Sequence, residues 1–284
     1  MPVIVDLHLH TTASDGRLSP TELVHLIGDK GLKVVSISDH DTTEGLAEVY
    51  YAAKEFPDMQ VIPGIELSTD IPGDEIHMLG YFIQYGDPDF QTVLRGFRAG
   101  RLERGRLIVE KLATLGLDIE WERVQQIAAE GSVGRPHIAL ALVEKGYFKE
   151  PKEPFFEYLG RNGLAYVERE KMTPAEGVNL LTGVAGVPVL AHPSQLKNLD
   201  EKVEELKSHG LMGMEVYYST YPPDTIQYLL GVARRHDLIP CGGSDFHGLG
   251  NTREPVPGIM GPPMETVERL EEAHRNLVLA NKQS

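Results

Sequence analysis

The sequence of 284 residues is poor in cysteine, and Cys241 is the only one. No intramolecular disulfide bond can form, and no cluster of thiolates can bind a metal ion. The chain also lacks a charge-free apolar run of about 18 residues or more, so we expect no membrane-spanning helix. The first residues show no basic segment followed by a long apolar run. We therefore expect no secretory signal and a cytoplasmic location.

Positive charge is scarce as well, because 27 Lys and Arg residues stand against 42 Asp and Glu residues, a formal net charge of −15. A surface of this sign repels polyanions, so we expect a protein that binds neither duplex nucleic acid nor a membrane. A small phosphorylated substrate stays compatible with this charge, because bound metal cations can reverse the sign of the field within one cleft. The 41% hydrophobic and 24% charged residues are typical of a globular protein.

Short apolar runs rich in β-branched residues recur along the chain and predict seven strands. These strands are expected at Val3–Leu7, Val34–Ser38, Val61–Leu67, Ile76–Phe82, Val187–Ala191, Met212–Tyr217 and Leu238–Gly242. Ser19-Pro20-Thr21-Glu22 and Thr173-Pro174-Ala175-Glu176 are typical helix starts, with a capping hydroxyl, proline and a glutamate three residues later. The alternation predicts parallel strands with crossover helices. Seven such strands indicate an α/β fold, a distorted (β/α)7 barrel.

A different pattern separates the fourth and fifth strands. Consecutive helices are predicted there over Arg101–Leu115, Trp121–Glu130 and His137–Lys145. We expect residues 90–161 to form a helical insertion over the active site, and residues 1–89 and 162–284 to form the barrel. A final amphipathic helix is predicted at Glu265–Ala280.

Histidines and carboxylates gather at or near the ends of the predicted strands. His8 and His10 follow the first strand, and residues two apart in a strand point to the same side. Further candidates along the chain are Asp15, His40, Glu66, His77, His192, Asp245 and His247. Barrel enzymes build their sites where the strands end, and imidazole with carboxylate suits Mn, Fe or Zn. The alternative is a set of unrelated core and surface residues, which fits only the histidines of the predicted helices.

In this order the motifs resemble those of the PHP (polymerase and histidinol phosphatase) family over nearly the whole chain. The resemblance rests on His8-Leu9-His10, Asp15, Asp39-His40-Asp41, Gly64-Ile65-Glu66, His77, Ala191-His192-Pro193 and Asp245-Phe246-His247. It implies a distorted seven-stranded barrel and a trinuclear metal site. One ion would be held by His8, His10, Glu66 and Asp245, a second by Asp15, His40 and His247, and a third by Glu66, His77 and His192.

The predicted insertion contains Gly134-Arg135-Pro136-His137, which resembles the corresponding segment of the small-nucleotide branch of that family. Members of this branch remove the 5′-phosphate of 3′,5′-nucleoside bisphosphates or trim short RNA from its 5′ end. We expect Arg135 to bind phosphate, because a guanidinium matches a phosphate edge with two parallel hydrogen bonds. His137 can add a donor, and Arg161 is a weaker candidate for a phosphate contact. The other interpretation is that this motif only begins a helix.

The sequence therefore predicts a metal-dependent phosphoesterase that hydrolyses a phosphate monoester of a small nucleotide, and it leaves open the trimming of short RNA. We expect in-line attack by a hydroxide that bridges two of two or three divalent ions, Mn²⁺ first, with Zn²⁺ or Fe²⁺ as alternatives. Asp245 or His247 can move a proton. Three alternatives are a histidinol-phosphate phosphatase, a metal-dependent hydrolase of carbon–nitrogen or carbon–oxygen bonds, and a non-catalytic module that binds metal or nucleotide.

Overall fold

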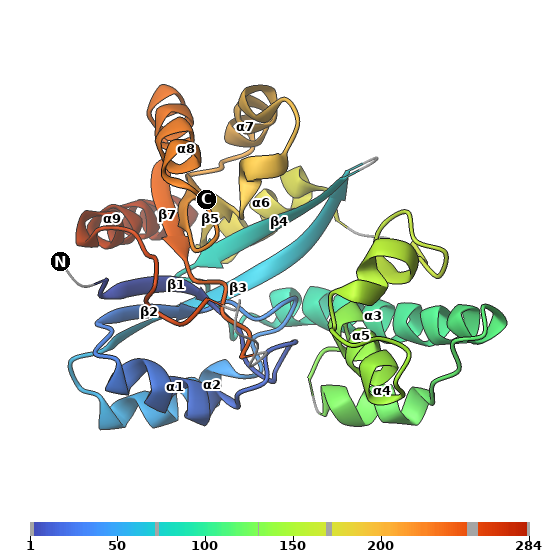
Figure 1. Ribbon diagram of the computed structural model, residues 1–284. Coiled ribbons are helices and arrows are strands. Elements are labelled where there is room, and N and C mark those ends of the chain that lie inside the picture. Colours follow the sequence, from blue (N-terminus) through green and yellow to red (C-terminus); the bar gives the residue numbers. More distant parts are fainter. Residues whose placement is uncertain (1–2, 72–73, 130, 169–171, 249–254, 283–284) are drawn as a thin grey trace.

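A single sheet of seven strands, in the order β1 to β7, forms the centre of the molecule (Figure 1). The computed structural model describes residues 3–71, 74–129, 131–168, 172–248 and 255–282. The strands are β1 Val5–Leu9, β2 Val34–Ile37, β3 Gln60–Ile71, β4 Asp74–Tyr81, β5 Val187–Leu190, β6 Gly213–Tyr218 and β7 Ile239–Gly243. Leu9 and Phe246 form a bridge that brings the two ends of the sheet together. The predicted distorted seven-stranded barrel is confirmed.

The near-closure of the barrel depends on a close backbone approach at Gly243. A Cβ atom at this position would lie 2.4 Å from the backbone nitrogen of His8, so only glycine fits. Next to it, the Asp245 backbone nitrogen donates to the His8 carbonyl oxygen at 2.9 Å, and that of His10 donates to Phe246 at 3.0 Å. These contacts hold the histidines of β1 beside the segment after β7.

The predicted parallel arrangement is wrong at β4. This strand runs antiparallel to both β3 and β5, whereas the other neighbouring strands are parallel. Only two residues separate Ile71 from Asp74, and a parallel connection needs a crossover of about a dozen residues or more. β4 therefore returns as a hairpin in which Ser68 lies opposite His77. This reversal brings the first half of β4, rather than its end, to the rim where the parallel strands end.

All seven strands differ from their predicted bounds by one or more residues, and the differences at β1 and β3 affect the site. β1 lies two residues further along, at Val5–Leu9, so His8 is inside the strand. β3 continues past the expected Leu67 to Ile71, because its outer half pairs with β4. Glu66 therefore lies in the interior of a long strand, five residues before its end, and not next to the end of a short one.

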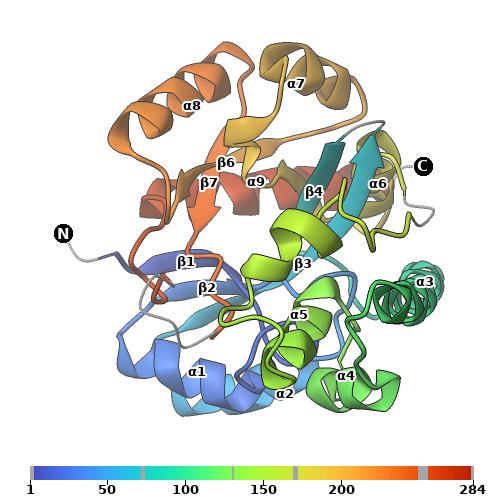
Figure 2. The same cartoon turned by 45° about the vertical axis from the view of Figure 1, so that its right-hand side comes forward.

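Helices cover the outside of the sheet (Figures 1 and 2). The helices α1 Pro20–Asp29 and α6 Pro174–Gly183 begin at the predicted motifs, where the hydroxyls of Ser19 and Thr173 each accept from a backbone nitrogen at 3.2 Å. The others on the barrel are α2 Leu46–Ala52, α7 Leu199–Ser208, α8 Pro223–Arg235 and α9 Met264–Asn281, with 3-10 turns at Ala53–Glu55 and Pro193–Gln195. None of the described helices is long and apolar enough to cross a membrane.

Between β4 and α6 the chain forms α3 Pro88–Thr114, α4 Trp121–Ala128, α5 Arg135–Glu144 and a π-helical turn at Phe155–Leu159. They lie together beside the barrel and share a hydrophobic cluster that includes Ile108, Val124 and Leu142 (Figure 2). The division at residues 90 and 161 stays a prediction, with which this cluster agrees. α3 begins 13 residues before the predicted Arg101. The sequence did not predict this first half because Gly96 and Gly100 weaken its helical pattern.

Candidate metal centre

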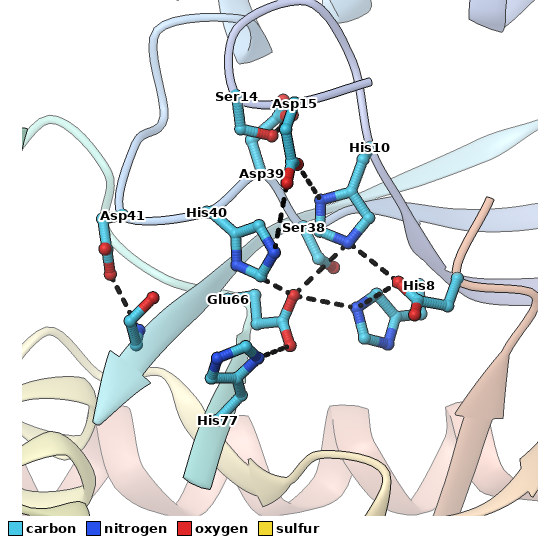
Figure 3. A network of polar contacts seen from close by, with 12 residues as sticks. His8, His10, Ser14, Asp15, Ser38, Asp39, His40, Asp41, Glu66 and His77 are labelled. Atoms are coloured by element: carbon cyan, nitrogen blue, oxygen red, sulfur yellow. Dashed lines mark hydrogen bonds and ion pairs between the residues drawn. The ribbon is translucent and has the colours of Figure 1, made fainter. Parts of the chain in front are cut away.

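The carboxylate of Glu66 lies at the centre of the predicted ligands and is almost fully buried (Figure 3). Its Oε1 atom lies 2.8 Å from His77 Nδ1 and 3.0 Å from His192 Nε2. Its Oε2 atom faces three other imidazoles, at 3.1 Å from His8 Nε2, 3.3 Å from His10 Nε2 and 3.2 Å from His40 Nδ1. Because its two oxygens face different histidines, this carboxylate is placed to bridge neighbouring cations.

Three groups of potential ligand atoms surround Glu66, with the atoms of each group within 4.8 Å of one another. The first holds His8, His10, Glu66 and Asp245, the second His10, Asp15, His40 and His247, and the third His40, Glu66 and His77. The first is the expected set, and the second adds His10 to the expected three. The third contains His40, while the expected His192 reaches the cluster through its contact with Glu66. The ligand roles themselves stay predictions.

Several buried ligand atoms of the cluster lack hydrogen-bond partners within the described residues. They are both ring nitrogens of His10, Nδ1 of His40 and Oδ1 of Asp15. His10 Nε2 lies 3.1 Å from Asp245 but is not directed along a hydrogen bond to it. An unsatisfied buried polar atom costs about 1–3 kcal/mol, which coordination of a cation would offset. With imidazole and carboxylate ligands alone, the residues fit divalent ions of the Mn, Fe or Zn type.

Burial and neighbouring charges set the protonation of the cluster without ions. Burial opposes ionisation of Glu66, but His40 and His8 hold its pKa well below the usual range. Burial alone would lower the pKa of His77, yet Glu66 outweighs it and raises that pKa to about 9. For His247, Asp15 and Asp245 overcome burial in the same way and raise the pKa to about 10. Protonated histidines thus balance the carboxylates, and a bound cation would displace those protons.

Two aspartates beside His40 hold the loops around the cluster. Asp39 accepts hydrogen bonds from the Thr11 backbone nitrogen at 2.8 Å and from the Ser14 hydroxyl at 2.6 Å, which fixes the loop that carries Asp15. Asp41 has a left-handed backbone, with φ of 55°, and accepts from the Ser68 backbone nitrogen at 2.8 Å. The Asp39-His40-Asp41 motif therefore supplies one potential ligand and two anchors.

Glu215, on β6, is a buried carboxylate that the sequence analysis missed. Its Oε1 atom lies 3.0 Å from His8 Nδ1, and its Oε2 atom accepts from the His192 backbone nitrogen at 2.8 Å. His192 has a left-handed backbone with φ of 29°, which this hydrogen bond helps to hold. A carboxylate behind a ligating histidine fixes the orientation of the ring. The signal in the sequence is a lone acidic residue within the apolar run Met212–Tyr217.

We expect Glu215→Gln to weaken metal binding about tenfold while the fold stays intact, because glutamine keeps the shape but removes the charge behind His8. Calorimetric titration of the chelator-treated protein with Mn²⁺ measures the affinity, and circular dichroism reports the fold. Glu204→Gln, at an exposed position of α7, is the matched control. Equal Mn²⁺ affinity in Glu215→Gln and the wild type would contradict the positioning role.

A cavity between the insertion and the cluster is lined by Arg101, Arg104 and Arg135 on one side and by Asp15, His40 and His77 on the other. Arg135 is the first residue of α5, so its motif does begin a helix, and its phosphate-binding role stays a prediction. Its guanidinium is only 20% exposed and donates to Glu75 Oε2 at 2.8 Å.

Two predicted substrate contacts have structural partners instead of lining this cavity. His137 is buried, and its Nδ1 accepts from the Gly134 backbone nitrogen at 2.9 Å, which caps α5. Arg161 donates to the carboxylate of Asp70 at 2.6 Å and ties the insertion to the outer end of β3. Their roles in substrate binding stay predictions.

Arg101 and Arg104, which lie on α3, were not predicted as site residues from the sequence. Arg101 Nε donates to Asp41 at 2.7 Å, and Arg104 Nε donates to the Val167 carbonyl oxygen at 2.8 Å. Nothing in a helical pattern distinguishes these arginines from solvated ones, since only the packing of α3 against the rim turns them toward the cluster. Tyr218 was missed as well, and its hydroxyl donates to Asp245 Oδ2 at 2.5 Å.

The sequence matches the PHP domain over residues 6–153. It is 35% identical to a 5′-3′ exoribonuclease of Haemophilus influenzae, with 85% of this chain and 89% of that protein covered. It is 30% identical to a 3′,5′-nucleoside bisphosphate phosphatase of Chromobacterium violaceum, with 87% and 88% covered. The structure is similar to that of a protein of Bifidobacterium adolescentis assigned as a metal-dependent phosphoesterase, with a TM-score of 0.86, 30% identity, and 95% and 96% covered.

Proposed function

The chain belongs to the PHP domain family and is a metal-dependent phosphoesterase, and we propose that its substrates are small nucleotides. The proposed reaction removes the 5′-phosphate of a 3′,5′-nucleoside bisphosphate, and the same site trims short RNA from its 5′ end. A 5′-3′ exoribonuclease and a 3′,5′-nucleoside bisphosphate phosphatase each align along most of the chain, which supports the proposal.

The observation that carries this proposal is the cavity lined by three arginines beside the candidate metal ligands. Arg101, Arg104 and Arg135 face the same space as His40 and His77. A nucleotide with two phosphates can place one at the metal ligands and the other among guanidinium groups, which bind phosphate edges with paired hydrogen bonds. Three arginines thus gather in one cavity, beside the carboxylates of Asp15 and Glu75, within a chain whose formal net charge is −15.

Each group of side chains has a distinct task in the proposed reaction. The nine predicted ligands would hold two or three divalent ions, Mn²⁺ in our proposal, which would neutralise charge and lower the pKa of a water molecule. Arg135 orients the phosphate that is not attacked. The Tyr218 hydroxyl holds the carboxylate of Asp245 in place, and either Asp245 or His247 accepts and returns a proton at its side chain.

The composition of the arginine cavity also separates this substrate from its rivals. Histidinol phosphate has no second phosphate that could bind these guanidinium groups. A neutral carbonyl compound, the substrate of a carbon–nitrogen or carbon–oxygen hydrolase, gains nothing from them. A non-catalytic role is disfavoured because every expected ligand residue is present at the cluster.

Steady-state kinetics with Mn²⁺ present test the proposal. We expect kcat/KM for adenosine 3′,5′-bisphosphate to exceed that for adenosine 5′-phosphate by about tenfold, because the second phosphate forms charge-assisted hydrogen bonds of about 1.5–3 kcal/mol. A metal chelator should abolish both activities. Equal turnover of histidinol phosphate, or no effect of the 3′-phosphate, would contradict the proposed substrate.

A further inference from the structure

A second cavity reaches the cluster from the side of the loops that follow β5 and β6. His77 and His192 line its inner end, and Leu196, Tyr218 and Tyr221 line its walls. Glu75 and His77 border this cavity and the arginine cavity alike, so the two spaces meet at the candidate metal ligands. We call it the tyrosine cavity.

The walls of the tyrosine cavity differ from those of the arginine cavity in their charged groups and in their aromatic rings. No Lys or Arg is among the described residues that line it. The rings of Tyr218 and Tyr221 are partly buried, with centroids 4.9 Å apart, and the Tyr218 ring lies 5.8 Å from that of His192. The Tyr221 hydroxyl accepts from the Ser194 backbone nitrogen at 3.1 Å, which fixes this ring. The aromatic rings suit a flat neutral ring, and the walls lack the guanidinium groups of the arginine cavity.

A phosphodiester needs a second binding space next to the phosphate at the candidate metal ligands, which the arginine cavity alone does not provide. A monoester carries one organic group on the phosphate at the metal ligands, whereas a diester carries two. The downstream RNA chain carries further phosphates, which suit the arginines. The 5′-terminal nucleoside carries a base and a sugar and needs space on the other side of the same phosphate. Of these two cavities, the tyrosine cavity is the one whose walls suit a base and a sugar.

We propose that the tyrosine cavity binds the 5′-terminal nucleoside of short RNA, with the base against Tyr218 and Tyr221, while the downstream phosphates occupy the arginine cavity. This inference rests on the proposed function and deepens it. In the hydrolysis step, a water oxygen bonds to phosphorus and the bond from phosphorus to the 3′-oxygen of the terminal nucleoside breaks. That oxygen takes a proton, and the phosphate stays on the 5′-oxygen of the next nucleotide.

The test uses substrates that differ in one group. Adenosine 3′,5′-bisphosphate is the monoester, its 5′-phosphate methyl ester is a diester without a second base, and its adenosine 3′-ester at the same phosphate is the dinucleotide. In the wild type, KM for the dinucleotide should be at least about fivefold below that for the methyl ester, because stacking on aromatic side chains strengthens base binding. This comparison needs no variant and so does not depend on the folding of one.

Tyr221→Leu should lower kcat/KM for the dinucleotide about five- to a hundredfold, mainly through KM, and leave hydrolysis of the monoester and the methyl ester within about twofold. Tyr221→Phe keeps the ring but loses the hydrogen bond from Ser194, so its kcat/KM for the dinucleotide should lie between those of Tyr221→Leu and the wild type. Tyr228→Leu, at a tyrosine of α8 that is 52% exposed, is the matched control.

The outcomes separate this inference from the proposed function. Equal losses on all three substrates in Tyr221→Leu would overturn the inference, and so would a wild type that hydrolyses the monoester but not the dinucleotide. In both cases the proposed phosphatase activity stands. A wild type that hydrolyses none of the three substrates with Mn²⁺ overturns the proposed function itself.

Discussion

Replacement of Glu66 by glutamine should lower hydrolysis of a nucleoside bisphosphate by about a thousandfold or more and should reduce the number of bound metal ions. Removing a single group that stabilises the transition state typically costs about a hundred- to a thousandfold, and Glu66 serves more than one ion in our proposal. Its two oxygens contact five histidines from four other segments of the chain. A carboxamide oxygen carries no charge to hold the same cations.

Metal content and activity are measured on the same preparation, by elemental analysis and by steady-state kinetics with adenosine 3′,5′-bisphosphate. Glu268→Gln is the matched control, because this exposed glutamate of α9 lies outside the cluster. His8→Ala should also lower the metal content, although it removes a ligand of one proposed ion only. A Glu66→Gln protein with full metal content and near-normal activity would contradict the proposed metal centre.

Arg135→Ala should lower kcat/KM for the same substrate by about ten- to a hundredfold without changing the metal content. The loss of a charge-assisted contact with phosphate costs about 1.5–3 kcal/mol, and no proposed ligand is removed. Lysine at this position should restore only part of the activity, because it keeps the charge but not the two parallel hydrogen bonds.

The contact between Arg135 and Glu75 allows a sharper form of this experiment. Glu75 Oε2 accepts from the guanidinium at 2.8 Å, so phosphate and carboxylate compete for the same donors. In Glu75→Gln, the carboxylate no longer competes with phosphate for Arg135. The double variant Glu75→Gln, Arg135→Ala, compared with Glu75→Gln alone, should therefore show the full loss of kcat/KM that removal of the phosphate contact causes. Wild-type kinetics in Arg135→Ala would contradict the proposed role and leave Arg101, Arg104, His137 or Arg161 to bind the phosphate.

Features that depend on neighbouring residues could be predicted from the sequence. The capping motifs at Ser19 and Thr173 start helices because hydroxyl, proline and glutamate act within a single turn. His8 and His10 share one side of β1 because strand geometry repeats every two residues. The order of the apolar runs predicted seven strands, and the residue types of the motifs predicted a metal centre of imidazoles and carboxylates.

Which of these residues come into contact depends on how the whole chain packs. His77 faces Glu66 because β4 is antiparallel to its neighbours, and the residue pattern of a strand does not show whether it pairs in a parallel or an antiparallel way. Glu215 supports His8 across 207 positions of the chain, and Arg101 reaches Asp41 only because α3 packs against the rim. These contacts depend on strand order and on helix docking, which are properties of the whole packed core. Local sequence patterns predict the candidate residues, whereas the closure of the barrel sets the distances between them.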